Sequence, residues 1–310
     1  MPSSIASGGR IRTNIPALNA YNSLQSSNRA IAKSQLRLST GKRINAASDD
    51  VAGYITSRSL NSRNVSLKAA LNAVGEAKNV TSISQDALDN ITNLLTQIKD
   101  AASQASSGAL GTDEKVALAK AAFRLSEQIQ TVVDSTVFGG QELLNGSFSG
   151  DFVIGVGESN SLITIEVDLS SSNSTNFNTD VNFELNSDTA ANFGGITGLN
   201  LASLDSVSDS DLGMFSAANI STTLTSLSDA LDNVSKVASF VGGLEARLNS
   251  QEDLLTSQIT NYKSAISRIE DVDVAEEQLD LVKSQFLQQT SIITLSQANQ
   301  NPQTYLQLFG

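Results

Sequence analysis

The chain is 310 residues long and contains no Cys, His or Trp, which excludes disulfides, thiolate chemistry and imidazole ligands for metals. Because no paired-carboxylate or glycine-rich phosphate motif takes the place of histidine, we expect neither an enzyme nor a bound cofactor or metal. The net charge is −12, yet residues 1–68 carry ten Lys and Arg against two Asp, and no Lys or Arg lies between Arg124 and Lys236.

The sequence also argues against nucleic-acid binding, a cleavable signal and membrane insertion. Aromatic residues do not interleave with the basic ones, so the charge indicates an acidic partner surface or a solvated face rather than nucleic acid. Residues 1–13 resemble a flexible leader and lack the apolar core of a cleavable signal. No stretch approaches the ~18 consecutive apolar residues that cross a bilayer, so no membrane insertion is expected.

A first helix is predicted to begin near Pro16, with Thr13 or Asn14 as its cap, and to end at Gly41. Apolar residues recur at sevens along it, but the residues between them are mostly polar, so its apolar face is incomplete. The recurring positions are Ala17, Leu24, Ile31 and Leu38. Residues 42–53 are predicted to form a connecting loop.

Two further helices with 4-3 apolar spacing are predicted, one ending near Ser107 and one following the turn at residues 108–113. The first seam consists of Ala70, Ala73, Ala77, Val80, Ser84, Ala87, Ile91, Leu94, Ile98, Ala101 and Ala105, and the second of Leu118, Ala122, Leu125, Ile129 and Val132. Alanine-rich seams permit close approach of a partner helix with larger side chains.

The pattern changes at Val137, where turn residues and β-branched runs replace the helical spacing. Residues 152–156 and 162–167 predict a β-hairpin joined by residues 157–161, and residues 181–185 predict a further short strand. Residues 203–216 are acidic and polar. A metal site formed by Asp205, Asp209 and Asp211 is conceivable there, but such loops are usually solvated.

From Ile220 to Ile269 a second long seam runs at alternating steps of four and three, which predicts a helix of roughly 75 Å. Only Glu245 and Glu252 interrupt it. We expect a mainly α fold: an elongated antiparallel coiled-coil bundle that pairs the N- and C-terminal halves, with a small β-hairpin in the middle of the chain. Three separate homodimeric coiled coils are the alternative.

The last segment, residues 271–310, is also predicted to be helical, with an apolar face that wraps around the helix. Its 4-3 positions are Leu279, Val282, Phe286 and Ile293. Helices with such imperfect faces gain most of their stability from packing on other chains. The alternative, that the two terminal helices pair inside a monomer, is compatible with this if assembly completes the packing.

Four stretches of the sequence resemble bacterial flagellin. Residues 13–20 and 36–53 are similar to its N-terminal signature, residues 137–146 to the stretch that leads into its hairpin, and residues 297–303 with Leu306 and Leu308 to its C-terminus. Together they imply a resemblance over roughly residues 13–168 and 218–308. The motif residues of the N-terminal loop are Arg37, Gly41, Asn45, Asp49, Asp50 and Gly53.

The resemblance implies an extracellular, self-assembling structural subunit of the flagellar filament, the helical propeller for swimming. Residues 1–45 with 271–310 would form the inner tube, residues 46–180 with 217–270 the rod and hairpin of the outer tube, and residues 168–217 a short variable insert in place of an outer domain. The family's terminal helices are disordered in the monomer. The implied assembly residues are Leu18, Leu24, Ile31, Leu38, Leu279, Val282, Phe286, Ile293, Leu306 and Leu308.

The same resemblance implies the other partners. The chain would be exported unfolded, without a cleaved signal, by the flagellar export apparatus. An export chaperone would cover the helix around residues 279–295, and hook-associated junction and cap proteins would contact the ends of the filament. The hook–filament junction protein shares this architecture and is the alternative function. A metallopeptidase insert, known in some flagellins, needs His-Glu-x-x-His and is excluded because the chain has no His.

Many flagellins carry a rod surface that an innate immune receptor contacts, and this surface is degenerate here. The aligned positions are Leu95, Gln97, Lys99 and Ala101, where Gln97 replaces an arginine and Ala101 a leucine. Loss of a charged and an apolar anchor weakens an interface by about 1–2 kcal/mol each where the anchors are hot spots.

We therefore predict little or no receptor activation by the purified monomer. The measurement is the response of receptor reporter cells across a concentration series. A response equal to that of a strongly stimulating flagellin at the same concentration would contradict the prediction.

Overall fold

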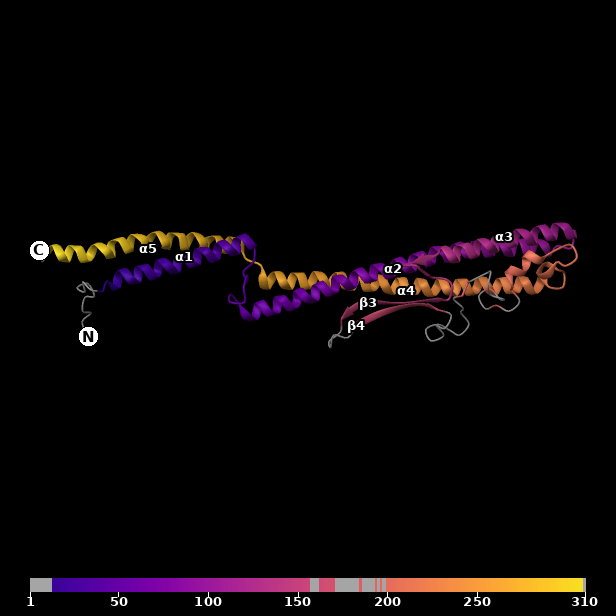
Figure 1. Cartoon of the computed structure of the whole chain (residues 1–310), viewed down its shortest axis with the longest axis horizontal. Coiled ribbons are helices and arrows are strands. Elements are labelled where there is room, and N and C mark those ends of the chain that lie inside the picture. The colour runs from indigo at the N-terminus through magenta and orange to yellow at the C-terminus, as the bar shows by residue number, and fades with distance from the viewer. Residues whose placement is uncertain are drawn as a thin grey trace. The chain divides into compact units, whose positions relative to one another are not determined.

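A computed structural model of the chain describes residues 13–156, 162–170, 184, 185, 193, 196 and 199–308 (Figure 1). It is mainly α-helical, as predicted. The helices are α1 (Ile15–Thr40), α2 (Val51–Ala105), α3 (Thr112–Ser135), α4 (Ile220–Glu270) and α5 (Val274–Leu308). The strands are β1 (Val137–Phe138), β2 (Gln141–Glu142), β3 (Ser147–Val156) and β4 (Leu162–Ser170), and two 3-10 turns are η3 (Leu201–Ser206) and η4 (Gly213–Phe215).

The chain divides into two compact units. Unit 1 comprises Met1–Asn64 with Thr260–Gly310, and unit 2 comprises Val65–Ile259. Helices α2 and α4 each contribute to both units. No helix in the described part of the chain is long and apolar enough to cross a membrane.

The predicted boundaries of α1 are confirmed. The Asn14 side chain accepts a hydrogen bond from the Ala17 amide at 3.1 Å, Pro16 lies in the first turn, and Gly41 ends the helix with φ of 70°. Only glycine adopts this left-handed conformation without steric cost. The loop that follows is shorter than predicted, because α2 begins at Val51 rather than after Gly53.

The core of unit 2 forms along the predicted seams. The α2 seam from Ala70 to Ala105 is buried except at Ala73, which is half-buried, and the α4 seam is buried at alternate positions such as Leu227, Val234 and Leu248. Lys78 of α2 forms an ion pair with Glu252 of α4 at 2.6 Å, so one glutamate that interrupts the seam has a cation beside it.

Three helices share this core, which is wider than a two-helix seam. Residues beside the predicted positions are also fully buried, among them Val74, Leu88 and Leu95 on α2 and Val133 on α3. A single chain thus covers its own seams, so the three-helix interpretation holds and separate homodimeric coiled coils are not needed to bury them.

The β-hairpin covers part of the same core and is longer than predicted. Strands β3 and β4 pair antiparallel from Ser147↔Ser170 to Val156↔Leu162, with an irregularity between Val153 and Gly155. Ile165 and Val167 on one face of β4 are buried in the core. The predicted connection, residues 157–161, lies outside the described residues. Residues 181–183 of the further strand also lie outside them, and Glu184 forms an isolated bridge with Asn145.

The segment before α4 departs from the prediction. Residues 203–216 carry exposed aspartates, including Asp205, Asp209 and Asp211, but the chain is anchored by buried apolar side chains in and beside the two 3-10 turns. The anchors are Leu201, Leu204, Val207 and Phe215. The polar composition concealed them because they do not recur at a helical or strand period.

Candidate assembly surface

Helices α1 and α5 lie side by side and antiparallel within unit 1 (Figure 1). The Asn14 side-chain amide donates to the Ala298 carbonyl at 2.8 Å, and Gln288 donates to Asn28 at 2.6 Å. At the other end of the pair, Arg37 contacts Glu277 at 3.3 Å. These contacts fix the register of the two helices, and each of them is polar.

The side chains that the pair buries are small or polar. Helix α1 buries Ala17, Ala20, Ser27 and Ser34, and the described side chains of α5 that are buried are Glu277 and Ala298. At roughly 25 cal/mol per Å² of apolar surface, such a set contributes little compared with buried Leu or Phe. Among the described side chains, the pair therefore has no fully buried large apolar residue.

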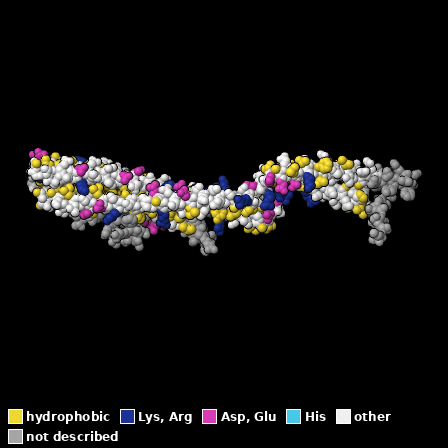
Figure 2. Space-filling model, turned by 180° about the vertical axis from the view of Figure 1, so that it is seen from behind, with side chains coloured by type: hydrophobic (Ala, Val, Ile, Leu, Met, Phe, Trp, Pro, Cys, Tyr) yellow, Lys and Arg dark blue, Asp and Glu magenta, His cyan; other side chains and the backbone are white. Residues whose placement is uncertain are grey.

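Several large apolar side chains of the two helices are exposed to solvent instead. Leu18 is 60% exposed, Leu279 72%, Val282 58%, Phe286 69% and Ile293 67%. Figure 2 shows hydrophobic side chains on the surface of the α1–α5 pair.

The other predicted assembly residues are less exposed or lie outside the description. Leu24, Ile31 and Leu38 are half-buried, and the side chains of Leu306 and Leu308 lie outside the described residues. Ile292, which lies off the 4-3 line and widens the apolar face of α5 as the sequence indicated, is exposed as well. Sequence reasoning missed four further exposed apolar residues that fall off this line: Ile15, Leu36, Val274 and Leu287.

A polar junction, defined as residues 41–50 with 269–273, holds the base of this helix pair. The Val272 amide donates to the Gly41 carbonyl at 3.1 Å, and the Arg43 guanidinium donates to the Ile269 carbonyl at 2.7 Å. The Lys42 ammonium contacts the Glu270 carboxylate at 3.1 Å. Backbone groups that loops would otherwise leave to water are thereby paired between the two connections.

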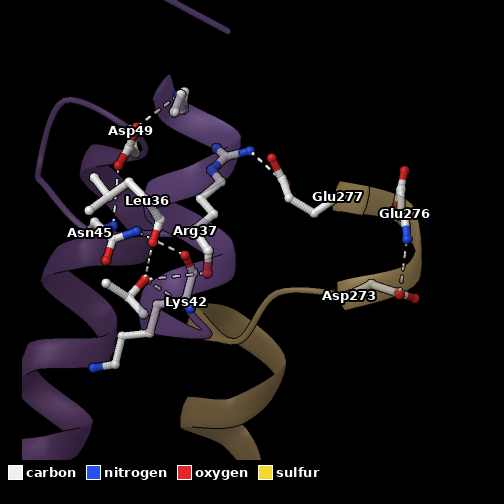
Figure 3. A network of polar contacts seen from close by, with 10 residues as sticks. Leu36, Arg37, Lys42, Asn45, Asp49, Asp273, Glu276 and Glu277 are labelled. Atoms are coloured by element: carbon white, nitrogen blue, oxygen red, sulfur yellow. Dashed lines mark hydrogen bonds and ion pairs between the residues drawn. The ribbon is translucent and has the colours of Figure 1, made fainter. Parts of the chain in front are cut away.

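Asp49 organises the N-terminal half of the junction (Figure 3). One carboxylate oxygen lies 2.8 Å from the Lys33 ammonium, and the other accepts from the amides of Asn45 and Ala46 at 3.2 Å. The hydrogen bond from Lys33, supported by these amides, lowers the pKa of Asp49 from 3.8 to about 2. Only 16% of the side chain is exposed, so the charged form is held in place by the fold.

Asp50 and Gly53 shape the start of α2. The Asp50 carboxylate accepts from the Gly53 amide at 2.9 Å, which caps the helix. A Cβ on Gly53 would lie 2.5 Å from that carboxylate and 2.7 Å from the Ile44 side chain, which is buried. Glycine is needed here for close packing, since the position has no unusual backbone angle to explain it.

The structure places the motif residues Arg37, Gly41, Asn45, Asp49, Asp50 and Gly53 in or beside the junction. Sequence reasoning identified them by resemblance and missed Lys33, Glu270 and Glu277, because an ion pair between residues far apart in the chain leaves no local signal. It also missed Asp273, although an Asp followed three residues later by Glu276 is a local signal for the start of a helix. Asp273 caps α5 by accepting from the Ala275 and Glu276 amides at 2.9 and 3.3 Å.

The predicted receptor-facing residues do not share one surface. Leu95 is fully buried and Ala101 is buried in the core of unit 2, whereas Gln97 is exposed and Lys99 half-buried. Leu95 and Ala101 lie on the seam side of α2, so in this chain only Gln97 and part of Lys99 are available to a partner.

Comparison with known proteins gives one consistent result. The bacterial flagellin N-terminal helical region matches residues 11–149, and the bacterial flagellin C-terminal helical region matches residues 224–309. Flagellin of Bacillus subtilis is 31% identical over 96% of this chain and 99% of its own length, and flagellin of Listeria monocytogenes is 26% identical over 97% and 99%. A flagellar hook-associated protein structure from Vibrio parahaemolyticus shares the fold, with a TM-score of 0.56, 15% identity, and coverage of 72% of this chain and 100% of that one.

The junction yields a pH-dependent prediction. Because the folded-state pKa of Asp49 is depressed, its stabilising contribution is present above about pH 4 and is lost as the pH falls toward 2. We expect Asp49→Asn to lower the free energy of unfolding at pH 6 by about 1 kcal/mol, a value reduced by solvent around the half-exposed Lys33. Denaturant unfolding followed by circular dichroism at pH 6, 4 and 2.5 measures the difference.

The matched control is Asp280→Asn, which removes an exposed α5 carboxylate that forms none of the ion pairs among the described residues. The gap between wild type and Asp49→Asn should be largest at pH 6 and should narrow steadily toward pH 2.5, because the folded-state pKa of Asp49 is about 2. A gap that is constant with pH, or equal to that of the control, would contradict the assignment.

Proposed function

This chain belongs to the bacterial flagellin family and is therefore a structural subunit of the extracellular flagellar filament, and from this premise we propose how it assembles: neighbouring copies bury the exposed apolar faces of α1 and α5. The observation that carries the proposal is the exposure of Leu279, Phe286 and Ile293 on a helix pair without an apolar core.

The proposal follows from the balance of burial and entropy. Fully burying a Leu, Ile or Phe side chain gains about 1.5–3 kcal/mol. Ordering the backbone of one residue costs about 1–2 kcal/mol, so helices that bury mainly Ala and Ser are marginal alone. Neighbouring copies would supply the missing apolar contacts, and α1 and α5 would become fully ordered only in the filament.

The domain assignment is part of the proposal. Residues 1–45 with 271–310 would form the inner tube, residues 46–180 with 217–270 the outer tube, and residues 168–217 a short insert. The contrast in packing supports it: the helices of unit 2 enclose a continuous apolar core, whereas the α1–α5 pair does not. A subunit that resists deformation in one part and gains order in another suits a polymer that transmits torque.

Export and the remaining partners are also proposed. The chain would cross the export apparatus unfolded and without a cleaved signal. The absence of Cys and the low aromatic content, 5% of residues, suit such threading. A chaperone would cover the exposed face of α5 between Leu279 and Leu295 until assembly. Junction and cap proteins would meet the same kind of surface at the filament ends.

The hook–filament junction role remains the second candidate. The hook-associated protein from Vibrio parahaemolyticus supports it only at the level of fold, since it is 15% identical to this chain. The relatives that match over nearly their full length are named flagellin. Cells that lack this gene separate the roles. A filament subunit predicts absent or shortened filaments, whereas a junction protein predicts unassembled filament subunits in the medium, because nothing anchors them.

The assembly proposal makes a quantitative prediction. Leu279→Ala combined with Phe286→Ala removes two large apolar side chains that solvent already covers in the free subunit, so the fold of unit 2 should not change. Each loses about 1–3 kcal/mol of burial on assembly, so the critical concentration for seeded polymerisation should rise by at least about tenfold.

The control is Leu254→Ala on α4, which truncates a side chain of comparable exposure, 49%, outside the α1–α5 pair. Sedimentation of polymer from a concentration series measures the critical concentration. If the double variant polymerises at the wild-type concentration, the faces of α5 do not drive assembly.

A further inference from the structure

The first turns of α2 present a second apolar face that the described residues leave uncovered. Val51 is 62% exposed and Ile55 64%, and Arg58 follows at the next step of the same 4-3 spacing. This spacing places the three side chains on one side of the helix. Ser57 and Asn64 are buried on the other side, so the face of Val51, Ile55 and Arg58 points away from the rest of unit 1.

The charge at the end of this face has no acidic partner among the residues that the structure describes. The Arg58 guanidinium lies over the Tyr54 ring, 5.1 Å from its centroid. None of the ion pairs between described residues includes Arg58. A planar guanidinium stacked on an aromatic ring keeps its donor edge free and its orientation fixed, which suits recognition of carboxylates.

The outer face of the β-hairpin carries the opposite charge. Asp151 of β3 and Glu166 of β4 are directly opposite each other in the ladder and both are exposed. Like charges in a cross-strand pair destabilise a hairpin. No Lys or Arg occurs between Arg124 and Lys236, and none of the ion pairs between described residues includes either carboxylate.

We propose that the α2 face of Val51, Ile55 and Arg58 docks on the outer face of the β3–β4 hairpin of a neighbouring copy, with Arg58 between Asp151 and Glu166. The contact rests on the proposed filament assembly and adds to it a second surface, distinct from the apolar faces of α1 and α5.

Three features make a second copy the fitting occupant. The two faces are complementary in charge, and the half-buried Val153, next but one to Asp151 on the same side of β3, offers apolar surface to Val51 and Ile55. The repulsion between Asp151 and Glu166 is relieved when a guanidinium enters. A contact between two different patches is heterologous, so it can repeat from copy to copy along a filament, whereas an isologous contact closes into a dimer.

Charge exchange tests the contact. Arg58→Glu and Glu166→Arg should each raise the critical concentration for seeded polymerisation about tenfold, and the double variant should return it to within about twofold of wild type. Lys120→Glu is the matched control, because Lys120 is an exposed α3 cation that also lacks an ion pair among the described residues. It should leave the critical concentration unchanged.

Two neutral variants distinguish loss of the contact from misfolding of the subunit. Glu166→Gln removes the cross-strand repulsion, so the melting temperature of the monomer should hold or rise while polymerisation weakens severalfold. Arg58→Gln should weaken polymerisation similarly, without additivity in the double variant. Polymerisation of either neutral variant at the wild-type concentration, or the absence of rescue by the exchange, would overturn the contact. Failure of the wild-type chain to polymerise would instead overturn the assembly proposal itself.

Discussion

The α1–α5 pair aligns two helices without burying their large apolar side chains, and this constraint underlies the account of the molecule. The contacts that set its register are polar, from Asn14 with Ala298 to Arg37 with Glu277. Partly buried polar pairs define geometry, but the cost of removing their groups from water offsets much of the attraction, so they add little stability. In the proposed assembly, the register of the pair is set in the free subunit, and neighbouring copies cover its exposed apolar side chains.

The polar junction holds the base of this helix pair within unit 1. Gly41, Asp49 and Gly53 let two chain connections lie close together, while Asp273 starts α5 at a fixed residue. In unit 2, helices α2, α3 and α4 pack their apolar seams together, and the β3–β4 hairpin covers part of the same core. A filament built in this way would combine a preformed wall with terminal helices that become ordered only when neighbours are present.

Much of the fold could be predicted from the sequence, because long helices with a 4-3 period carry a strong signal. The seam from Ala70 to Ala105 and the stop at Gly41 were correctly predicted for physical reasons. Other features depend on tertiary contacts and have no local signal. The burial of Leu95 requires a third helix, Leu204 and Phe215 anchor an irregular segment, and the partner of Asp49 is known only once α1 and the loop are placed together. The resemblance to a known family identified the motif residues of the junction. The contacts that they form could be assigned only from the structure.

Hydrogen exchange read by mass spectrometry on monomer and filament tests the central claim most directly. The account predicts that amides of α1 and α5 exchange rapidly in the monomer, that amides of α2 around Ile91 are already protected there, and that polymerisation protects α1 and α5. Equal protection of α5 and the Ile91 region in a monomer that remains single would contradict it, because the terminal helices would then be stable without neighbours.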